Sequence, residues 1–187
     1  MEKVGVLALQ GSFAEHLAIL RRMPGIEPLE VKTIAQLEAV DRLIIPGGES
    51  TAIGKLLRKT GMLPLLQKRI EEGLAVWGTC AGLILLAKRI VGEEPYLDAM
   101  DITVKRNAYG SQLDSFRCEQ IIPAISAKPI HLVFSRAPWI EAVGPEVEVL
   151  AERDGRIIAA KQGRLLATSF HPELTQDTSV YEYFLQM

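Results

Sequence analysis

The chain has 187 residues, of which 48% are hydrophobic and 24% charged, a composition typical of globular proteins. Its net charge of -2 and its pI near 6.0 exclude the basic surface that drives nucleic-acid binding. The longest uncharged apolar segment, Leu74 to Ala87, is shorter than the roughly 20 residues of a membrane helix, and the start shows no signal-peptide layout. We therefore expect a cytoplasmic protein that binds neither nucleic acid nor membranes.

The first half of the chain alternates between short apolar runs and helical patterns. Strands are predicted at Val4–Leu9, Leu29–Val31, Leu43–Ile45 and Leu74–Trp77. Helices are predicted at Phe13–Arg22, Ile34–Val40, Ser50–Lys59 and Pro64–Glu72, with another from Cys80 to Arg89. Ser12 and Glu15 have the spacing of a capping box at the first helix. This alternation predicts a three-layer α/β fold, in which helices flank a mostly parallel central sheet.

The second half has a different pattern. Val147 to Phe170 consists of short β-prone runs separated by the turn dipeptides Asp154-Gly155 and Gln162-Gly163, which predicts an antiparallel extension of the sheet near the C-terminus. A further strand is expected at Ile130–Phe134 and a final helix at Ser179–Gln186. No linker, repeat or low-complexity tract divides the chain, so residues 1–187 are expected to form one domain.

Cys80 lies between two glycines, in Gly78-Thr79-Cys80-Ala81-Gly82, where an apolar strand gives way to a helix. This is the spacing of a nucleophile elbow with cysteine in place of serine. The glycines relieve crowding in a sharp turn, and the helix N-terminus favours the thiolate. In open α/β sheets, ligands bind beyond the carboxyl ends of the strands, where this cysteine falls. The alternative is a buried cysteine that packs as a small hydrophobe.

A thiolate nucleophile needs a base, and the chain has three histidines. His16, in the first helix, and His131, in a predicted strand, favour surface or structural roles. His171 stands where the antiparallel region ends, and Pro172 after it favours an extended backbone. In an extended chain residues i and i+2 face the same side, so Glu173 is expected to meet His171 and hold its ring.

The attacked carbonyl also needs hydrogen-bond donors for its developing negative charge. Pro46-Gly47-Gly48 ends a neighbouring strand, and its backbone N–H groups are candidates, although a plain tight turn is the alternative. The N–H of Ala81, directly after the nucleophile, is the expected second donor. Gly48 and Ala81 are therefore predicted to form the oxyanion hole.

The two cysteines, Cys80 and Cys118, show neither a CxxC motif nor a metal-ligand spacing. We therefore expect no disulfide, no metal site and no cofactor. Cys118 is expected to be structural.

Three segments in this order resemble the class I glutamine amidotransferases: PGGEST (46–51), GTCAGL (78–83) and FHPEL (170–174). More narrowly, the chain resembles the glutaminase subunits of pyridoxal 5'-phosphate synthase, through LALQG (7–11), RNAYG (106–110), DSF (114–116) and SRAP (135–138). The resemblance spans nearly the whole chain. It departs from the family pattern at Ser111, where arginine is usual, and at Ser135, where isoleucine is usual.

The resemblance implies hydrolysis of L-glutamine to L-glutamate and ammonia. Cys80 would attack the γ-carboxamide, His171 would transfer the proton, Glu173 would orient His171, and water would hydrolyse a glutamyl thioester. The implied glutamine-binding residues are Gly47, Gly48, Glu49, Arg106, Ser135 and Arg136. A glutamate suits the substrate's ammonium group, and an arginine suits its carboxylate.

The resemblance also implies a partner, the barrel-shaped, ring-forming lyase subunit of pyridoxal 5'-phosphate synthase. The two chains would form a hetero-oligomer in which ammonia passes to the synthase for vitamin B6 biosynthesis. The chain alone is then expected to work poorly and to be activated by its partner, with the Gly47-Gly48 peptide as a plausible switch.

Three other interpretations remain open at this point. Another amidotransferase glutaminase, such as that of imidazole glycerol phosphate synthase, would share the fold and the triad, but PGGEST and RNAYG argue against it. A cysteine hydrolase or stress-response protein of a related α/β fold often carries histidine directly after the nucleophile, where Ala81 stands here. A catalytically silent regulatory subunit would not need Cys80, His171 and Glu173 together.

Overall fold

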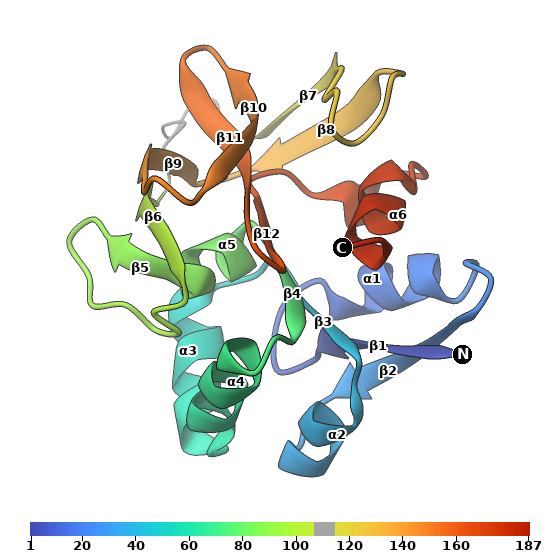
Figure 1. Ribbon diagram of the computed structural model, residues 1–187, viewed down its shortest axis with the longest axis vertical. Coiled ribbons are helices and arrows are strands. Elements are labelled where there is room, and N and C mark those ends of the chain that lie inside the picture. Colours follow the sequence, from blue (N-terminus) through green and yellow to red (C-terminus); the bar gives the residue numbers. More distant parts are fainter. Residues whose placement is uncertain (107–114) are drawn as a thin grey trace.

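The computed structural model describes residues 1–106 and 115–187 (Figure 1). Its strands are β1 (Glu2–Leu7), β2 (Ile26–Val31), β3 (Arg42–Ile45), β4 (Ala75–Thr79), β5 (Ala87–Ile90), β6 (Met100–Lys105), β7 (Ser115–Gln120), β8 (Ile130–Ser135), β9 (Trp139–Val143), β10 (Glu148–Arg153), β11 (Arg156–Gln162) and β12 (Leu165–Thr168). Its helices are α1 (Phe13–Leu20), α2 (Ile34–Ala39), α3 (Ser50–Lys59), α4 (Met62–Glu71), α5 (Ala81–Leu86), the short 3-10 helix η1 (Pro172–Leu174) and α6 (Ser179–Leu185). Residues 107–110, Ser111 and Asp114 of the sequence motifs lie outside the described residues.

The central sheet has the strand order β2-β1-β3-β4-β12-β11-β9-β6-β5, and β10 pairs with β11. Strands β2, β1, β3, β4 and β12 are parallel to one another, whereas β12, β11, β9 and β6 follow in antiparallel pairs. Strands β7 and β8 form a separate antiparallel pair. This arrangement confirms the predicted mostly parallel sheet with an antiparallel extension.

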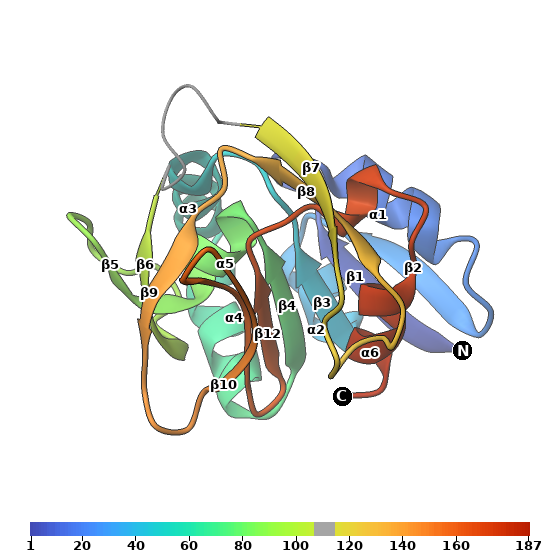
Figure 2. The same cartoon turned by 90° about the horizontal axis from the view of Figure 1, so that it is seen from above.

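Helices cover both faces of the sheet, as Figures 1 and 2 show from two directions. Side chains alternate between the faces along each strand. In β3, for example, Leu43 and Ile45 pack with the core beneath α2, α3, α4 and α5, whereas Ile44 packs with the core beneath α1 and α6. The buried, continuous apolar runs that predicted these strands therefore serve two cores at once.

Two local predictions need correction, the length of the helix after Cys80 and the cap at Ser12. The helix after Cys80 ends at Leu86, and Ala87–Ile90 form β5, which pairs with β6; residues 81–86 are all buried, whereas Lys88 and Arg89 are exposed. Ser12 makes no side-chain cap on α1, because its hydroxyl is used in other contacts described below. A capping box does occur at α2, where Thr33 and Gln36 bond reciprocally. The sequence also gave no sign of β5, β6, β7 and β9.

The antiparallel region contains a predicted turn and a strand that also pairs with the parallel part of the sheet. Asp154 and Gly155, with positive φ angles of 52° and 75°, form the predicted tight turn between β10 and β11. The last strand of this region, β12, pairs antiparallel with β11 but also parallel with β4. The chain segment that follows β12 therefore leaves the sheet at the same edge as the segment that follows β4.

No helix within residues 1–106 and 115–187 is long and apolar enough to span a membrane.

Candidate active site

Cys80 occupies a strained turn between β4 and α5. Its backbone angles are φ 52° and ψ -102°, a region that L residues rarely adopt. The flanking glycines are required by close packing: a Cβ at Gly78 would lie 2.4 Å from the carbonyl of Gly82, and a Cβ at Gly82 would lie 2.2 Å from the carbonyl oxygen of Ile45. The glycines of the motif thus allow the elbow to close tightly under the cysteine.

The pairing of β12 with β4 brings the histidine segment to this elbow. Thr168 at the end of β12 lies opposite Thr79, and the Cys80 N–H donates to the Thr168 carbonyl at 2.8 Å. Beyond β12, the His171 N–H donates to the carbonyl of Val133 in β8 at 2.8 Å. Backbone hydrogen bonds on both sides therefore fix the direction in which the chain reaches the cysteine.

His171 and Glu173 form a buried pair. Nδ1 of His171 lies 2.5 Å from Oε1 of Glu173. The expected contact is present, but the expected backbone is not: Pro172–Leu174 form a 3-10 turn, so the two side chains meet across a turn and not along an extended strand. The Ser12 hydroxyl also donates to Oε1 of Glu173, at 3.1 Å.

The charges of this group are coupled. Burial disfavours a charged imidazole, but the adjacent Cys80 sulfur and the Glu173 carboxylate outweigh burial and raise the pKa of His171 to about 10. Burial likewise opposes ionisation of Glu173, yet the hydrogen bond from His171 lowers the pKa of this carboxyl. These shifts favour an imidazolium and a carboxylate side by side at neutral pH.

The Gly47-Gly48 peptide borders the cysteine and the histidine. The Gly47 carbonyl accepts hydrogen bonds from the Ser12 N–H at 2.9 Å and from its hydroxyl at 3.3 Å. Because the C=O and N–H of a trans peptide point in opposite directions, the Gly48 N–H points away from Ser12. A Cβ at Gly47 would lie 2.4 Å from Cε1 of His171, so glycine is needed for this close approach.

A cleft of about 380 Å³ opens above these groups. All the predicted site residues line it: Gly47, Gly48, Glu49, Cys80, Ala81, Arg106, Ser135, Arg136, His171 and Glu173. Ser12, Ser50, Ile84 and Leu174 complete the lining. The fold thus brings these residues together from six separate parts of the chain; their roles in catalysis and binding stay predictions.

Opposite charges line one side of the cleft. Glu49 caps α3 by accepting from the Ala52 N–H at 3.0 Å, and the hydrogen bond from the Thr51 hydroxyl contributes most to lowering the pKa of its carboxyl. Arg106 lies 3.3 Å from Oε1 of Glu49, and its Nε lies 3.0 Å from Oε2 of Glu93. These contacts hold the Glu49 and Arg106 side chains in place at this side of the cleft.

Ser135 and Arg136 lie on another side of the cleft, where β8 ends. Cys80 Sγ lies 3.8 Å from the carbonyl oxygen of Ser135, so this residue meets the nucleophile through its backbone. A serine where the family usually has isoleucine leaves that contact unchanged. Arg136 is exposed, has a positive φ of 46°, and has no ion-pair partner within residues 1–106 and 115–187.

Sequence reasoning missed three residues at the base of this site. Ser12 contacts both Gly47 and Glu173, although its spacing had suggested a helix cap. His16 was expected to have a surface or structural role; it is buried and lies 3.5 Å from Oε2 of Glu173, and Tyr181 contacts His16 in turn. A local motif carries no signal for such contacts, because they join α1, η1 and α6 across the fold.

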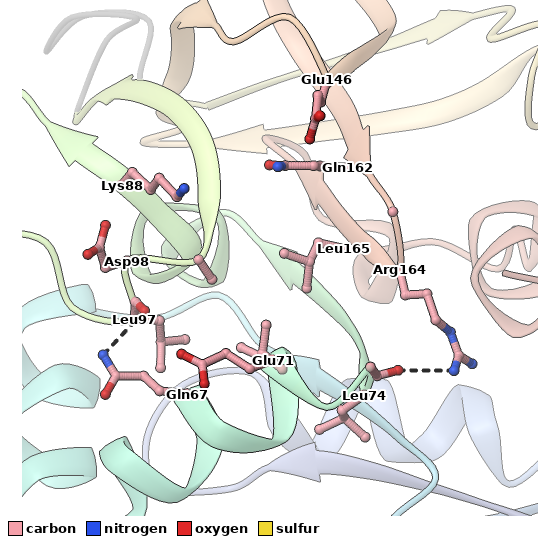
Figure 3. Close-up of a pocket in the computed structure, with 14 residues that line it drawn as sticks. Gln67, Glu71, Leu74, Lys88, Leu97, Asp98, Glu146, Gln162, Arg164 and Leu165 are labelled. Carbon is pink, nitrogen blue, oxygen red and sulfur yellow. Dashed lines mark hydrogen bonds between the residues drawn. The ribbon is translucent and has the colours of Figure 1, made fainter.

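A larger hollow, of about 670 Å³, lies at the opposite end of β4 and β12 (Figure 3). Glu71, Lys88, Glu146 and Arg164 contribute charges of both signs to it, and its described lining contains neither cysteine nor histidine. Arg164 there donates to the Gly73 carbonyl at 3.0 Å, which ties two loops together. Within residues 1–106 and 115–187, no group of His, Cys, Asp or Glu is arranged to hold a metal ion.

A cysteine at an α/β elbow, beside a buried histidine–carboxylate pair, is the arrangement that cysteine-dependent hydrolases and acyl-transfer enzymes use. Comparison with known proteins identifies the family within this class. The family model of the SNO glutamine amidotransferase family matches residues 6–187. The chain belongs to this family.

Relatives with solved structures or curated names agree. The chain is 55% identical over 186 residues to "Pyridoxal 5'-phosphate synthase subunit PdxT" of Caldanaerobacter subterraneus subsp. tengcongensis, covering 99% of this chain and 98% of that protein. It is 54% identical over 189 residues to the protein of the same name from Chloroflexus aurantiacus, covering 98% and 99%.

Solved structures extend the comparison to three dimensions. A crystal structure of a glutamine amidotransferase superposes with a TM-score of 0.92 at 49% identity, covering 98% of this chain and 97% of that one. The structure of PurLQS from Thermotoga maritima, at 16% identity and a TM-score of 0.67, covers 99% and 98% and shares the fold.

Proposed function

We propose that this chain is the glutaminase subunit of a pyridoxal 5'-phosphate synthase, which hydrolyses L-glutamine to L-glutamate and ammonia. The observation that carries the proposal is the meeting of Cys80, at its strained elbow, with the buried His171–Glu173 pair in a cleft that also holds fixed charges. The names of relatives more than 50% identical over the whole chain supply the pathway.

The proposed reaction has two stages, with Cys80 as the nucleophile. Its thiolate adds to the carbonyl carbon of the glutamine side-chain carboxamide, and the oxyanion receives hydrogen bonds from the N–H groups of Gly48 and Ala81. The His171 imidazolium gives its proton to the leaving nitrogen, so that ammonia departs and a γ-glutamyl thioester remains. Neutral His171 then takes a proton from water, which attacks the thioester and releases glutamate and the thiolate.

Glu173 is the acid that orients the histidine in this scheme. Its carboxylate, 2.5 Å from Nδ1 of His171, fixes the ring with Nε2 toward the cleft and stabilises the imidazolium. Nε2 of His171 is buried and has no hydrogen bond within the part of the chain that the structure describes. That nitrogen is therefore available to the sulfur, the leaving group and water in turn.

The charged rim of the cleft suits the two ionic groups of glutamine. In the proposal, Glu49 receives the α-ammonium group, and Arg136, which lacks an ion-pair partner among the described residues, receives the α-carboxylate. Arg106 holds Glu49 in place from 3.3 Å. Backbone atoms of Gly47, Gly48 and Ser135 complete the binding site.

The proposal includes a partner and a location. Residues 1–187 act as one glutaminase domain in the cytoplasm and pair with a barrel-shaped lyase subunit that forms the pyridine ring. Ammonia released into water would be protonated and diluted, so hydrolysis is useful when the acceptor site is coupled to it. The glutaminase reaction itself needs no metal or cofactor in this scheme.

Glutamate release from glutamine tests the proposal, measured with the chain alone and with a lyase subunit of pyridoxal 5'-phosphate synthase. We expect release that rises on addition of the lyase subunit, and a loss of at least about a thousandfold in Cys80→Ala. Cys118→Ala is the matched control and should retain most activity, since Cys118 lies in β7 outside the cleft. Wild-type rates in Cys80→Ala, or no release with the partner present, contradict the proposal.

A further inference from the structure

The two oxygens of the Glu173 carboxylate have different surroundings. Oε1 meets His171 and the Ser12 hydroxyl, at 2.5 and 3.1 Å. Oε2 is buried and has no hydrogen bond within residues 1–106 and 115–187, but Nε2 of His16 lies 3.5 Å away. A buried carboxylate oxygen that lacks a donor is costly, so this approach by a ring nitrogen calls for an explanation.

His16 is itself completely buried, in α1 beneath the elbow. Its Nδ1 lies 2.7 Å from the hydroxyl of Tyr181 in α6, and its ring meets Trp77 of β4 edge-on at 5.9 Å. The Thr79 hydroxyl lies 3.5 Å from Nε2, beside the contact with Glu173. A histidine that only filled space would not need polar partners at both ring nitrogens.

The proton on His16 can be assigned. Burial lowers the pKa of His16 to about 4, although the Glu173 charge opposes this shift, so the ring is neutral at pH 7 and has one N–H. Burial also raises the pKa of Tyr181 well above its usual value, so the hydroxyl keeps its proton and can donate it to Nδ1 of His16. The N–H of the ring then lies at Nε2, facing Oε2 of Glu173.

We propose that His16 is a positioning residue of the active site, whose Nε2–H holds Oε2 of Glu173 while Tyr181 fixes the tautomer. With Oε2 held, Oε1 stays directed at His171. A neutral donor suits this task, because it restrains the carboxylate without adding a second cation that competes with the His171 imidazolium. The inference rests on the proposed function and adds to it a contact between the triad and the helices α1 and α6.

Two matched substitutions separate positioning from packing. The amide nitrogen of His16→Gln reaches about the position of Nε2, whereas the amide of His16→Asn reaches only that of Nδ1; both remove the ring. We expect His16→Asn to lower kcat about tenfold more than His16→Gln does, with KM for glutamine unchanged in both, as a lost hydrogen bond to a charged group predicts. Equal kcat values in the two variants would overturn the proposal.

Further measurements cover the variants that fail to fold. Tyr181→Phe removes one oxygen and should lower kcat without changing KM; if both His16 variants are unfolded by circular dichroism, an unchanged kcat in Tyr181→Phe overturns the proposal. His131→Asn is the control, because His131 is exposed and lies 3.3 Å from Glu119. No change is expected there.

The assay distinguishes this inference from the proposed function itself. If the wild-type chain with its lyase partner releases no glutamate, the proposed function fails. The inference is then decided by NMR of the His171 Nδ1–H proton, whose resonance reports the contact with Glu173 without catalysis. We expect this resonance to move in His16→Asn and to stay near the wild-type position in His16→Gln; a resonance unmoved in both rejects the positioning role.

Discussion

Two hollows lie at opposite ends of the same strands, β4 and β12, and they differ in size and in chemistry. The hollow at the strand beginnings is the larger, about 670 Å³ against about 380 Å³ for the cleft at the strand ends (Figure 3). Among the described residues, Cys80, His171 and Glu173 line the smaller cleft, whereas the lining of the larger hollow contains neither cysteine nor histidine. The volume of a hollow therefore does not identify the candidate active site in this protein, whereas the direction of the strands does.

The physical reason is the parallel pairing of β4 with β12. Both strands end at the same edge of the sheet, so the residues that follow them, Cys80 and His171, are brought together there. The strand beginnings receive loops such as Gly73-Leu74 and Gly163-Arg164, in which ties between backbone and side chain stabilise the fold. If function is confined to the strand ends, substitutions there should lower activity and substitutions at the strand beginnings should not.

The largest effect is expected from the two members of the buried pair. We expect His171→Asn to lower kcat by roughly 10⁴-fold, and Glu173→Gln to be roughly tenfold milder, because Glu173 orients and stabilises but exchanges no proton. Glutamate release with the lyase partner measures both. A more severe loss in Glu173→Gln than in His171→Asn would show that the roles are assigned wrongly.

A single methyl group at Gly47 is the next test. In Gly47→Ala the new Cβ would lie 2.4 Å from Cε1 of His171, so the ring must shift. A misplacement of this kind predicts a loss of about a hundredfold in kcat. Gly25→Ala is the control: nothing lies within 4 Å of its Cβ position, although its φ of 76° makes the change strained. It should lower stability and leave kcat unchanged.

The pH dependence of stability tests the electrostatics of the two buried histidines at the strand ends, His16 and His171. The pKa of His16 is lowered to about 4, so its contribution is complete above pH 6.5 and is lost as pH falls toward 4, by about 3 kcal/mol. The pKa of His171 is raised to about 10, so its contribution is complete below pH 6.5 and is lost as pH rises toward 10.

Urea unfolding at pH 4, 5.5 and 7 measures the acid side of this profile. We expect His16→Gln to lose about 3 kcal/mol less than the wild type between pH 7 and pH 4, because the titrating imidazole is gone. Identical losses in the two proteins would show that the His16 ring is not held neutral.

The smallest effect is expected in the larger hollow. Lys88→Gln and Glu71→Gln remove charges that line it, and neither residue lines the cleft that contains Cys80. Changes at such positions are usually within 0.5 kcal/mol, so kcat/KM should stay within about twofold of wild type. A tenfold loss in either variant would mean that the hollow takes part in catalysis, and the contrast between the two ends would fail.

Much of this arrangement followed from the sequence, because it rests on local signals. The continuous apolar runs gave β1, β3 and β4, and the glycines around Cys80 gave the elbow. Helix α3 begins at Ser50 and ends at Lys59, as its pattern predicted. The predicted site residues all line one cleft because they follow strand ends or precede helices, where short motifs carry information.

Contacts between distant elements were beyond local reasoning. Nothing in the spacing of Ser12 and Glu15 distinguishes a helix cap from a serine whose hydroxyl bonds Gly47 and Glu173. The run after Cys80 fits a helix by composition, but tertiary pairing with β6 makes Ala87–Ile90 a strand. His16 looked like a structural residue, since burial and its polar partners arise only when α1, η1 and α6 pack together.

The step on which the proposed function depends most is the attack of Cys80 on the carbonyl carbon of the glutamine side-chain carboxamide. The most direct measurement uses a glutamine analogue that carries an electrophilic carbon in place of the side-chain carboxamide, incubated with the chain and its lyase partner, followed by peptide mass spectrometry. The account predicts one adduct per chain, on Cys80, whose formation is slowed by glutamine and abolished in His171→Asn. Modification of Cys118 in place of Cys80, or labelling of Cys80 that glutamine does not slow, would contradict it.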